Sequence, residues 1–109
     1  MSPDVLDWKR GRVTYWDLHE FDAARPLAEQ RILLKEDLAQ VHYPCGVLLD
    51  VGWYGYTNGS FGVRVILDRD WENPRFLREC ADAAALMQAM AAAIDVADRL
   101  ATARRGARL

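Results

Sequence analysis

The chain has 109 residues, of which 51% are hydrophobic, 10% aromatic and 28% charged. This length is typical of one domain, so residues 1–109 are predicted to fold as a single unit. No run of about 20 apolar residues is present, as a membrane-spanning helix would need. Residues 1–4 carry no basic stretch that leads into an apolar one, so we expect no secretory signal. The two cysteines, Cys45 and Cys80, predict free thiols in a reducing compartment. We therefore expect a soluble, cytoplasmic protein.

The net charge of −2 hides an uneven distribution along the chain. All 16 acidic residues lie before residue 99, together with ten basic residues, whereas the last eleven residues hold four arginines and no acid. An acidic body favours a basic partner and disfavours nucleic acid. The basic segment 101–109 is predicted to be a frayed helix end whose arginines complement the helix dipole.

The first predicted elements are a strand and a helix. Residues 12–18 are rich in β-branched and aromatic types, which is typical of a strand. Residues 22–34 predict a helix, because Asp22 can cap it and Pro26 suits its first turn. The residues that share one face of this helix are Leu27, Arg31 and Leu34.

Three segments with alternating apolar residues predict three further strands that share one apolar face. Their residues on that face are Ala39, Val41 and Tyr43, then Val47, Leu49, Val51 and Trp53, then Phe61, Val63, Val65 and Leu67. A three-residue turn, Pro44-Cys45-Gly46, joins the first two strands, with Gly46 in the left-handed region. The segment 55–59 contains Gly and Asn-Gly and joins the second and third strands.

The two turns fix the strand register. With Tyr43 opposite Val47, the apolar residues of the first two strands meet on one face, and a shift of one residue would mix the faces. The second hairpin is predicted to pair Tyr54 with Ser60. This register places Asp50 opposite Arg64 on the other face, which predicts a cross-strand ion pair.

A long C-terminal helix is predicted to cover the apolar face. Asp82 can cap it, and the apolar residues that recur at helical spacing are Leu86, Met90, Ile94, Ala97 and Leu100. Residues 74–80 are ambiguous, because Phe76, Arg78 and Cys80 alternate as in a strand while Asn73-Pro74 suits a helix start. The sequence predicts an α+β fold with helices on one face of an antiparallel sheet of three to five strands, in the approximate order β-α-β-β-β-α.

Candidate catalytic and metal-binding groups are few. Asp17 and His19 share one face of the first strand but lack a third ligand at a recognisable spacing. His42 and Cys45 lie near one turn, with no third group to orient a nucleophile. We expect no enzyme activity, no cofactor and no metal. The alternative is a small ligand- or metal-dependent enzyme that uses Asp17, His19 and His42.

Aromatic and acidic residues gather at one end of the predicted sheet. Tyr54 projects from the face opposite the core, and Tyr56 lies in the adjoining loop. The hairpin register places Glu36 and Asp37 next to Tyr54 and Trp53. Tyrosine is frequent at interface hot spots, and carboxylates select basic partners. A tyrosine-rich rim without a partner is the alternative. The candidate partner-binding residues are Glu36, Asp37, Tyr54, Tyr56, Asp68, Asp70 and Glu72.

Part of the chain resembles small bacterial immunity proteins, which accompany polymorphic toxins, including those of contact-dependent growth inhibition systems. The resemblance spans roughly residues 26–81. It lies in Lys35-Glu36-Asp37-Leu38-Ala39-Gln40-Val41-His42-Tyr43-Pro44, Leu48-Leu49-Asp50-Val51-Gly52-Trp53-Tyr54, Asp68-Arg69-Asp70-Trp71-Glu72-Asn73-Pro74 and Glu79-Cys80. It implies a cytoplasmic protein that binds and blocks the toxic C-terminal domain of a cognate toxin, often a nuclease. Contact residues do not transfer, because immunity surfaces vary with the toxin.

The leading prediction is therefore an acidic α+β inhibitor that occludes the active site of a basic toxin domain, without binding membranes or nucleic acid directly. A different class, a nucleic-acid-binding module, would use the tail residues Arg104, Arg105 and Arg108.

Overall fold

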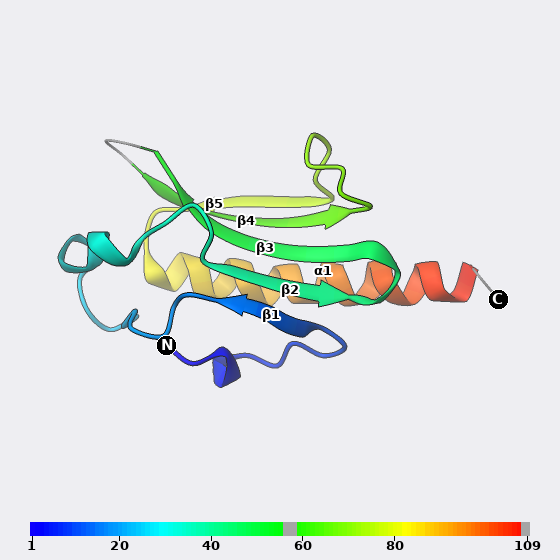
Figure 1. Cartoon of the computed structure of the whole chain (residues 1–109), viewed down its shortest axis with the longest axis horizontal. Helices are drawn as coiled ribbons and strands as arrows, with labels where there is room; N and C mark the ends of the chain where they lie inside the picture. Colours follow the sequence, from blue (N-terminus) through cyan, green and yellow to red (C-terminus); the bar gives the residue numbers. More distant parts are fainter. Residues whose placement is uncertain (56–58, 108–109) are drawn as a thin grey trace.

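The structure is a computed structural model that describes residues 1–55 and 59–107. Five strands form one antiparallel sheet in sequential order, and a single long α-helix lies behind it in the view of Figure 1. The elements are β1 (Arg12–Trp16), β2 (Ala39–Tyr43), β3 (Val47–Tyr54), β4 (Ser60–Leu67), β5 (Phe76–Cys80) and α1 (Ala83–Ala107), with 3-10 helices at Pro3–Val5, Leu27–Leu33 and Pro44–Gly46. The predicted α+β class is confirmed.

The two central hairpins have the predicted register. β2 pairs with β3 through Tyr43 and Val47, and β3 pairs with β4 through Tyr54 and Ser60. In the tight turn between β2 and β3, Cys45 and Gly46 both have left-handed backbones, with φ of 67° and 78°. The apolar residues of all three strands consequently face the same side of the sheet.

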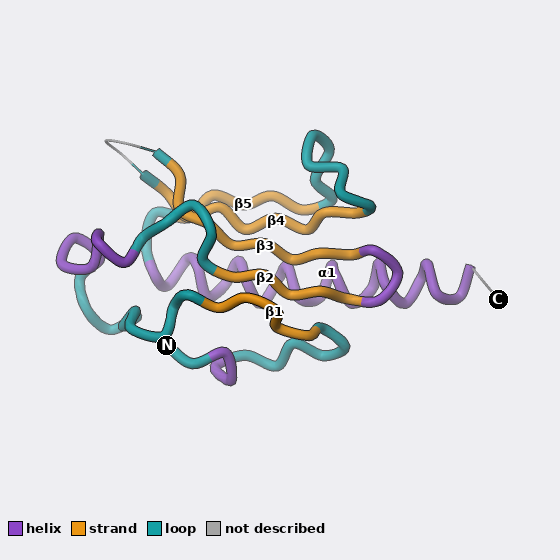
Figure 2. Tube along the Cα trace, in the orientation of Figure 1, coloured by secondary structure: helices purple, strands orange, loops and turns teal. Residues whose placement is uncertain are grey.

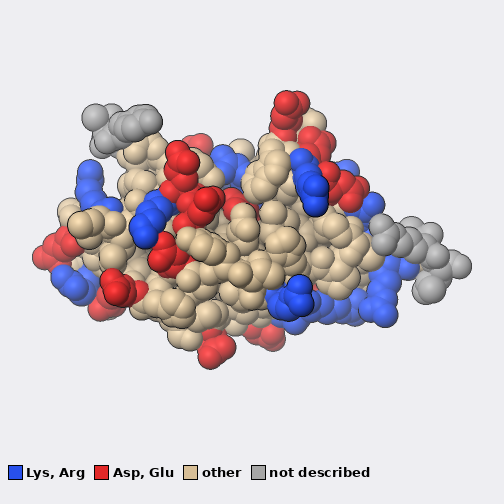
Figure 3. All heavy atoms as spheres, in the orientation of Figure 1, with Lys and Arg blue, Asp and Glu red and all other residues tan. Residues whose placement is uncertain are grey.

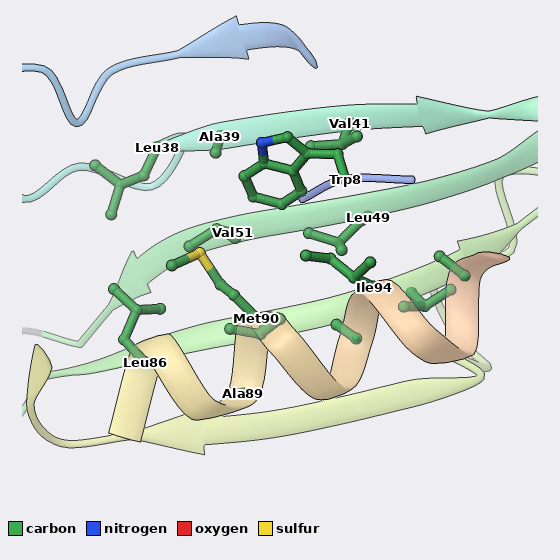
Figure 4. Close-up of a cluster of buried hydrophobic side chains, with 14 of the residues drawn as sticks. Trp8, Leu38, Ala39, Val41, Leu49, Val51, Leu86, Ala89, Met90 and Ile94 are labelled. Carbon is green, nitrogen blue, oxygen red and sulfur yellow. The ribbon is translucent and has the colours of Figure 1, made fainter. Parts of the chain in front are cut away.

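α1 covers that apolar side. The carboxylate of Asp82 accepts a hydrogen bond of 2.8 Å from the backbone N–H of Ala85, which confirms the predicted cap. Figure 4 shows Leu86, Met90 and Ile94 of the helix directed toward the strands. The side chains buried between helix and sheet include Val41, Leu49, Val51, Phe61, Val63, Val65, Leu86, Ala89, Met90, Ala93, Ile94 and Ala97. Each large side chain buried in this way contributes about 1.5–3 kcal/mol.

The predicted helix over 22–34 is wrong in its extent and type. Only Leu27–Leu33 is helical, as a 3-10 helix at one end of the sheet (Figure 2). The buried side chain of Gln30 explains the difference, because its amide accepts from the backbone N–H of Asp22 at 2.7 Å and donates to the Asp22 carbonyl at 2.8 Å. These bonds close residues 22–30 into a loop. Asp22 therefore caps no helix, and its carboxylate accepts from the N–H of Ala24.

The structure also gives the bounds of three other segments whose extent the sequence predicted differently or left open. The predicted strand over 12–18 ends at Trp16 and has an irregularity between Val13 and Tyr15. The ambiguous residues 74–80 contain strand β5, which pairs with β4. α1 continues through the basic tail to Ala107. Within residues 1–55 and 59–107, no helix is both long and apolar enough to cross a bilayer.

Candidate functional site

The face of the sheet opposite α1 is the candidate site, because no helix covers it in the part of the chain that the structure describes. We call it the open face. One cross-strand row runs across all five strands on it: Tyr15, Gln40, Asp50, Arg64 and Leu77. Figure 3 views this face, with uncharged side chains over its middle and acidic groups, interspersed with basic ones, toward its two ends.

Large side chains on this face are exposed to solvent. Tyr15 and Leu77 lie at the two ends of the row, because β1 and β5 are the edge strands of the sheet. Tyr15 is 42% exposed and Leu77 is 50% exposed. Tyr54 at the end of β3 is also exposed, and Trp71 is exposed in the loop between β4 and β5. Aromatic side chains of this kind provide most of the binding energy in protein interfaces.

Asp50 lies in the middle of the row and is only 2% exposed. Its Oδ1 accepts a hydrogen bond of 3.2 Å from Nε2 of Gln40, and it forms no ion pair within the described residues. Burial raises the pKa of the Asp50 carboxyl above its ordinary value, and the negative charge of Asp37 raises it further, against the hydrogen bond from Gln40 and the charge of Arg64. A buried carboxylate without a counter-ion destabilises the free protein.

The predicted ion pair between Asp50 and Arg64 is therefore wrong, although the two residues are paired as expected. The guanidinium carbon of Arg64 lies instead 4.7 Å from the centre of the Tyr54 ring, a cation–π contact. That ring lies across two glycines, since a Cβ on Gly52 would be 2.8 Å from the Tyr54 hydroxyl and one on Gly62 would be 3.0 Å from its ring. The glycines thus make room for Tyr54, which holds Arg64.

The structure brings together the predicted residues at the Tyr54 end of the sheet. The backbone N–H of Trp53 donates to the carbonyl of Lys35 at 2.9 Å, which fixes Lys35 and Glu36 beside β3. A cleft of about 330 Å³ there is lined by Leu34, Lys35, Glu36, Trp53, Tyr54 and Gly55. Asp37 lines a neighbouring recess with Tyr15 and Gln40. Tyr56 lies outside the described residues.

The other predicted acidic residues lie at the opposite end of the sheet. Asp68 forms an ion pair of 2.9 Å with Arg104 of α1, and the carboxylate of Asp70 accepts two hydrogen bonds of 3.2 Å from the amide of Asn73. Glu72 is exposed in the same loop. The predicted partner-binding residues therefore form two separate groups, one at each end of the open face.

A cavity of about 590 Å³ adjoins this second group. It is lined by His42, Gly46, Val47, Leu48, Asp68, Arg69 and Trp71. The consecutive residues Asp68 and Arg69 have left-handed backbones, with φ of 53° and 62°, which is strained for residues other than glycine. The loop is held in this conformation by the ion pair to Arg104 and by a 3.0 Å bond from the Asp68 N–H to the Gly46 carbonyl.

The residues of the enzyme alternative do not meet in one site. Asp17 and His19 line a cleft of about 340 Å³ with Lys35, whose ammonium is 3.0 Å from the Asp17 carboxylate. His42 lines the separate cavity beside Trp71. Among the described His, Cys, Asp and Glu residues, no group of three or more is placed to hold a metal ion.

Sequence reasoning missed Tyr15, Gln40, Asp50 and Trp71 as candidate binding residues. Each of the three strand residues occupies an outward position of a predicted strand, and Asp50 interrupts an otherwise apolar segment. The sequence does contain a signal for these residues: it predicts one long helix, and one helix can cover only one face of the sheet. The residues at outward positions were therefore candidates for a binding surface.

The chain matches no protein-family model, no curated protein and no solved structure. The predicted resemblance over residues 26–81 therefore stays a prediction.

Proposed function

We propose that this chain is an immunity protein that binds a cognate toxin domain and neutralises it by occluding its active site. The observation that carries the proposal is the open face, where exposed Tyr15, Tyr54, Trp71 and Leu77 lie among carboxylates. Such a surface combines aromatic anchors with negative charge. In this proposal the protein acts in the cytoplasm, and it transforms no substrate.

The proposed partner is a basic domain, of which a nuclease is the best example, because a nuclease active site binds phosphates with cationic groups. Glu36 and Asp37 at one end and Asp70 and Glu72 at the other are exposed and would take the place of those phosphates. Opposite charges also accelerate the encounter of the two proteins. The aromatic side chains would then supply the contact area that lengthens the lifetime of the complex.

The dimensions of the molecule fit such a complex. A stable interface takes about 800 Å² from each partner, which is roughly an eighth of the accessible surface of 6604 Å². A single face of the sheet can provide that area, and its backbone is held by strand pairing on every strand. The inhibitor would therefore bind without a large rearrangement.

Co-expression with the toxin domain encoded beside this chain tests the proposal. Cells that carry the wild-type protein are expected to survive, and cells without it to die. Tyr15→Arg places a cation on the open face and is expected to abolish protection. Gln88→Arg places the same cation on the exposed side of α1 and is expected to preserve it. Death of cells that express the soluble wild-type protein would contradict the proposal.

A further inference from the structure

The buried carboxylate of Asp50 adjoins a small recess in the open face. The recess has a volume of about 140 Å³ and is lined by Tyr15, Asp37 and Gln40. Gln40 connects the two, because its Nε2 donates to Asp50 while its side chain lines the recess. Gln40 Oε1 accepts no hydrogen bond from the described residues, so it can accept one from a ligand.

The charge of this region is unbalanced. Asp50 forms no ion pair among the described residues, and neither does Asp37. Two neighbouring cations have other contacts: Arg64, whose charge acts on Asp50 without forming an ion pair, lies over the Tyr54 ring, and the Lys35 ammonium is 3.0 Å from Asp17. The recess therefore presents an aromatic ring and hydrogen-bond acceptors, and no cation lines it.

The volume of the recess decides the size of the ligand. Pockets for drug-sized molecules measure about 300–1,000 Å³, and this recess is well below that range. It fits the head of one side chain. A planar guanidinium matches it best, since it can stack on the Tyr15 ring while its five N–H donors reach the Asp37 carboxylate and the Gln40 carbonyl oxygen.

We propose that the recess between Tyr15, Asp37 and Gln40 receives one arginine side chain of the partner, which supplies the counter-ion that Asp37 and the buried Asp50 lack. In naming a partner, this inference rests on the function proposed above. It adds that Asp50 acts as a binding residue: it destabilises the free protein and favours the complex. A carboxylate with only a structural role would stabilise the free protein and the complex alike.

An NMR titration with N-acetyl-arginine-methylamide tests the recess without the toxin. We expect saturable shifts of the Gln40 side-chain amide and of the Tyr15 and Asp37 backbone amides, with a Kd on the order of millimolar, as for a single anchoring group. The neutral glutamine analogue is expected to cause none. Asp37→Asn, at an exposed position, is expected to remove the shifts, whereas Asp17→Asn, a carboxylate outside the recess, is expected to retain them.

Asp50→Asn provides the second readout. The variant is expected to melt at a higher temperature than the wild type and to lose the arginine-induced shifts. Absence of saturable shifts in the wild type, or equal shifts in Asp37→Asn or Asp50→Asn, would overturn the inference. Such a failure alongside full protection from the toxin would leave the proposed function standing. If the protein bound the arginine analogue but did not protect cells from the toxin, the proposed function would be refuted and the arginine-binding recess would stand.

Discussion

The guanidinium of Arg64 on β4 lies over the ring of Tyr54 on β3, 4.7 Å from the ring centre. Arg64 makes this contact and forms no ion pair with Asp50, the carboxylate directly opposite it in the β3–β4 register. Tyr54 thereby contacts the cation that strand pairing places directly opposite the buried carboxylate.

Removal of the Tyr54 ring is expected to lower the pKa of Asp50. In Tyr54→Leu, Arg64 loses its aromatic partner and is free to approach the carboxylate, and an opposite charge stabilises the ionised form. Tyr54→Phe keeps the ring but loses the hydrogen bond between the Tyr54 hydroxyl and Arg64, so it is expected to lower the pKa of Asp50 less than Tyr54→Leu does. A pH titration of the Asp50 carboxyl ¹³C shift checks both variants. An unchanged value in Tyr54→Leu would contradict this account of the contact.

The stability of the protein is expected to depend on the ionisation of Asp50. Its pKa is raised in the folded state by burial, so the folded state binds its proton more tightly than the unfolded state does. Stability consequently falls as pH rises from the unfolded pKa of about 3.9 through the raised folded pKa, and the loss is complete above it. Asp37, Gln40, Arg64 and Tyr54 surround this group.

Asp50→Asn removes that loss while keeping the acceptor for Gln40. The variant is expected to be more stable than the wild type at neutral pH by on the order of 1 kcal/mol, or about 4 °C in Tm. The difference should shrink as pH is lowered below the folded pKa, where wild-type Asp50 is also neutral. Urea unfolding at several pH values measures it, and a variant less stable than the wild type at pH 7 would contradict the expected sign.

The two glycines beneath Tyr54 are expected to differ in their tolerance of a methyl group. A Cβ on Gly52 would overlap the backbone carbonyl oxygen of Glu36, which cannot move without breaking the Lys35–Trp53 hydrogen bond. Gly52→Ala should therefore destabilise the protein by at least about 2 kcal/mol. A Cβ on Gly62 would lie 3.0–3.2 Å from the Tyr54 ring and 3.3 Å from Nη1 of Arg64, both of which belong to side chains.

Because the Tyr54 ring is exposed and can tilt, Gly62→Ala should destabilise by about 1 kcal/mol. Chemical denaturation of both variants measures the two values. Equal destabilisation by the two substitutions would show that the Glu36 carbonyl does not limit the space at Gly52.

The strained loop beside Trp71 provides another prediction. Arg69 has φ of 62°, a conformation that disfavours residues with a Cβ by roughly 1–2 kcal/mol relative to glycine, partly offset by the greater freedom of glycine in the unfolded chain. Arg69→Gly is expected to be more stable than Arg69→Ala by about 0.5–1 kcal/mol. Both variants lack the arginine side chain, so their difference in unfolding free energy isolates the backbone. A more stable alanine variant would contradict the left-handed conformation.

The sequence predicted the central sheet closely because its turns and its alternation of apolar residues act locally. The Pro44–Gly46 turn sets the register between β2 and β3, with Tyr43 opposite Val47. The alternating apolar residues of β3 and β4 set the register between those two strands, with Tyr54 opposite Ser60. The predicted helix over 22–34 was wrong because the conformation of this segment is not determined by a local pattern. Its conformation depends on where the single side chain of Gln30 forms its hydrogen bonds, and helical periodicity does not report that.

The candidate site was predicted in part. Pairing rules placed Glu36 and Asp37 near Tyr54, and they placed Asp50 opposite Arg64. They could not predict that Arg64 would contact the Tyr54 ring, because two partners were within reach and the choice depends on the space above Gly52 and Gly62. The ion pair between Asp68 and Arg104 joins positions 36 residues apart, which local patterns do not connect.

The proposed function requires that the open face contacts the toxin domain, and hydroxyl-radical footprinting of the complex measures that contact. The reagent labels solvent-accessible aromatic and sulfur-containing side chains: Tyr15, Tyr54 and Trp71 are exposed on the open face, and Met87 on α1 is partly buried. We expect complex formation to reduce the labelling of Tyr15, Tyr54 and Trp71 strongly and to leave that of Met87 on α1 unchanged. Reduced labelling of Met87 with full labelling of Tyr15 and Trp71 would contradict it.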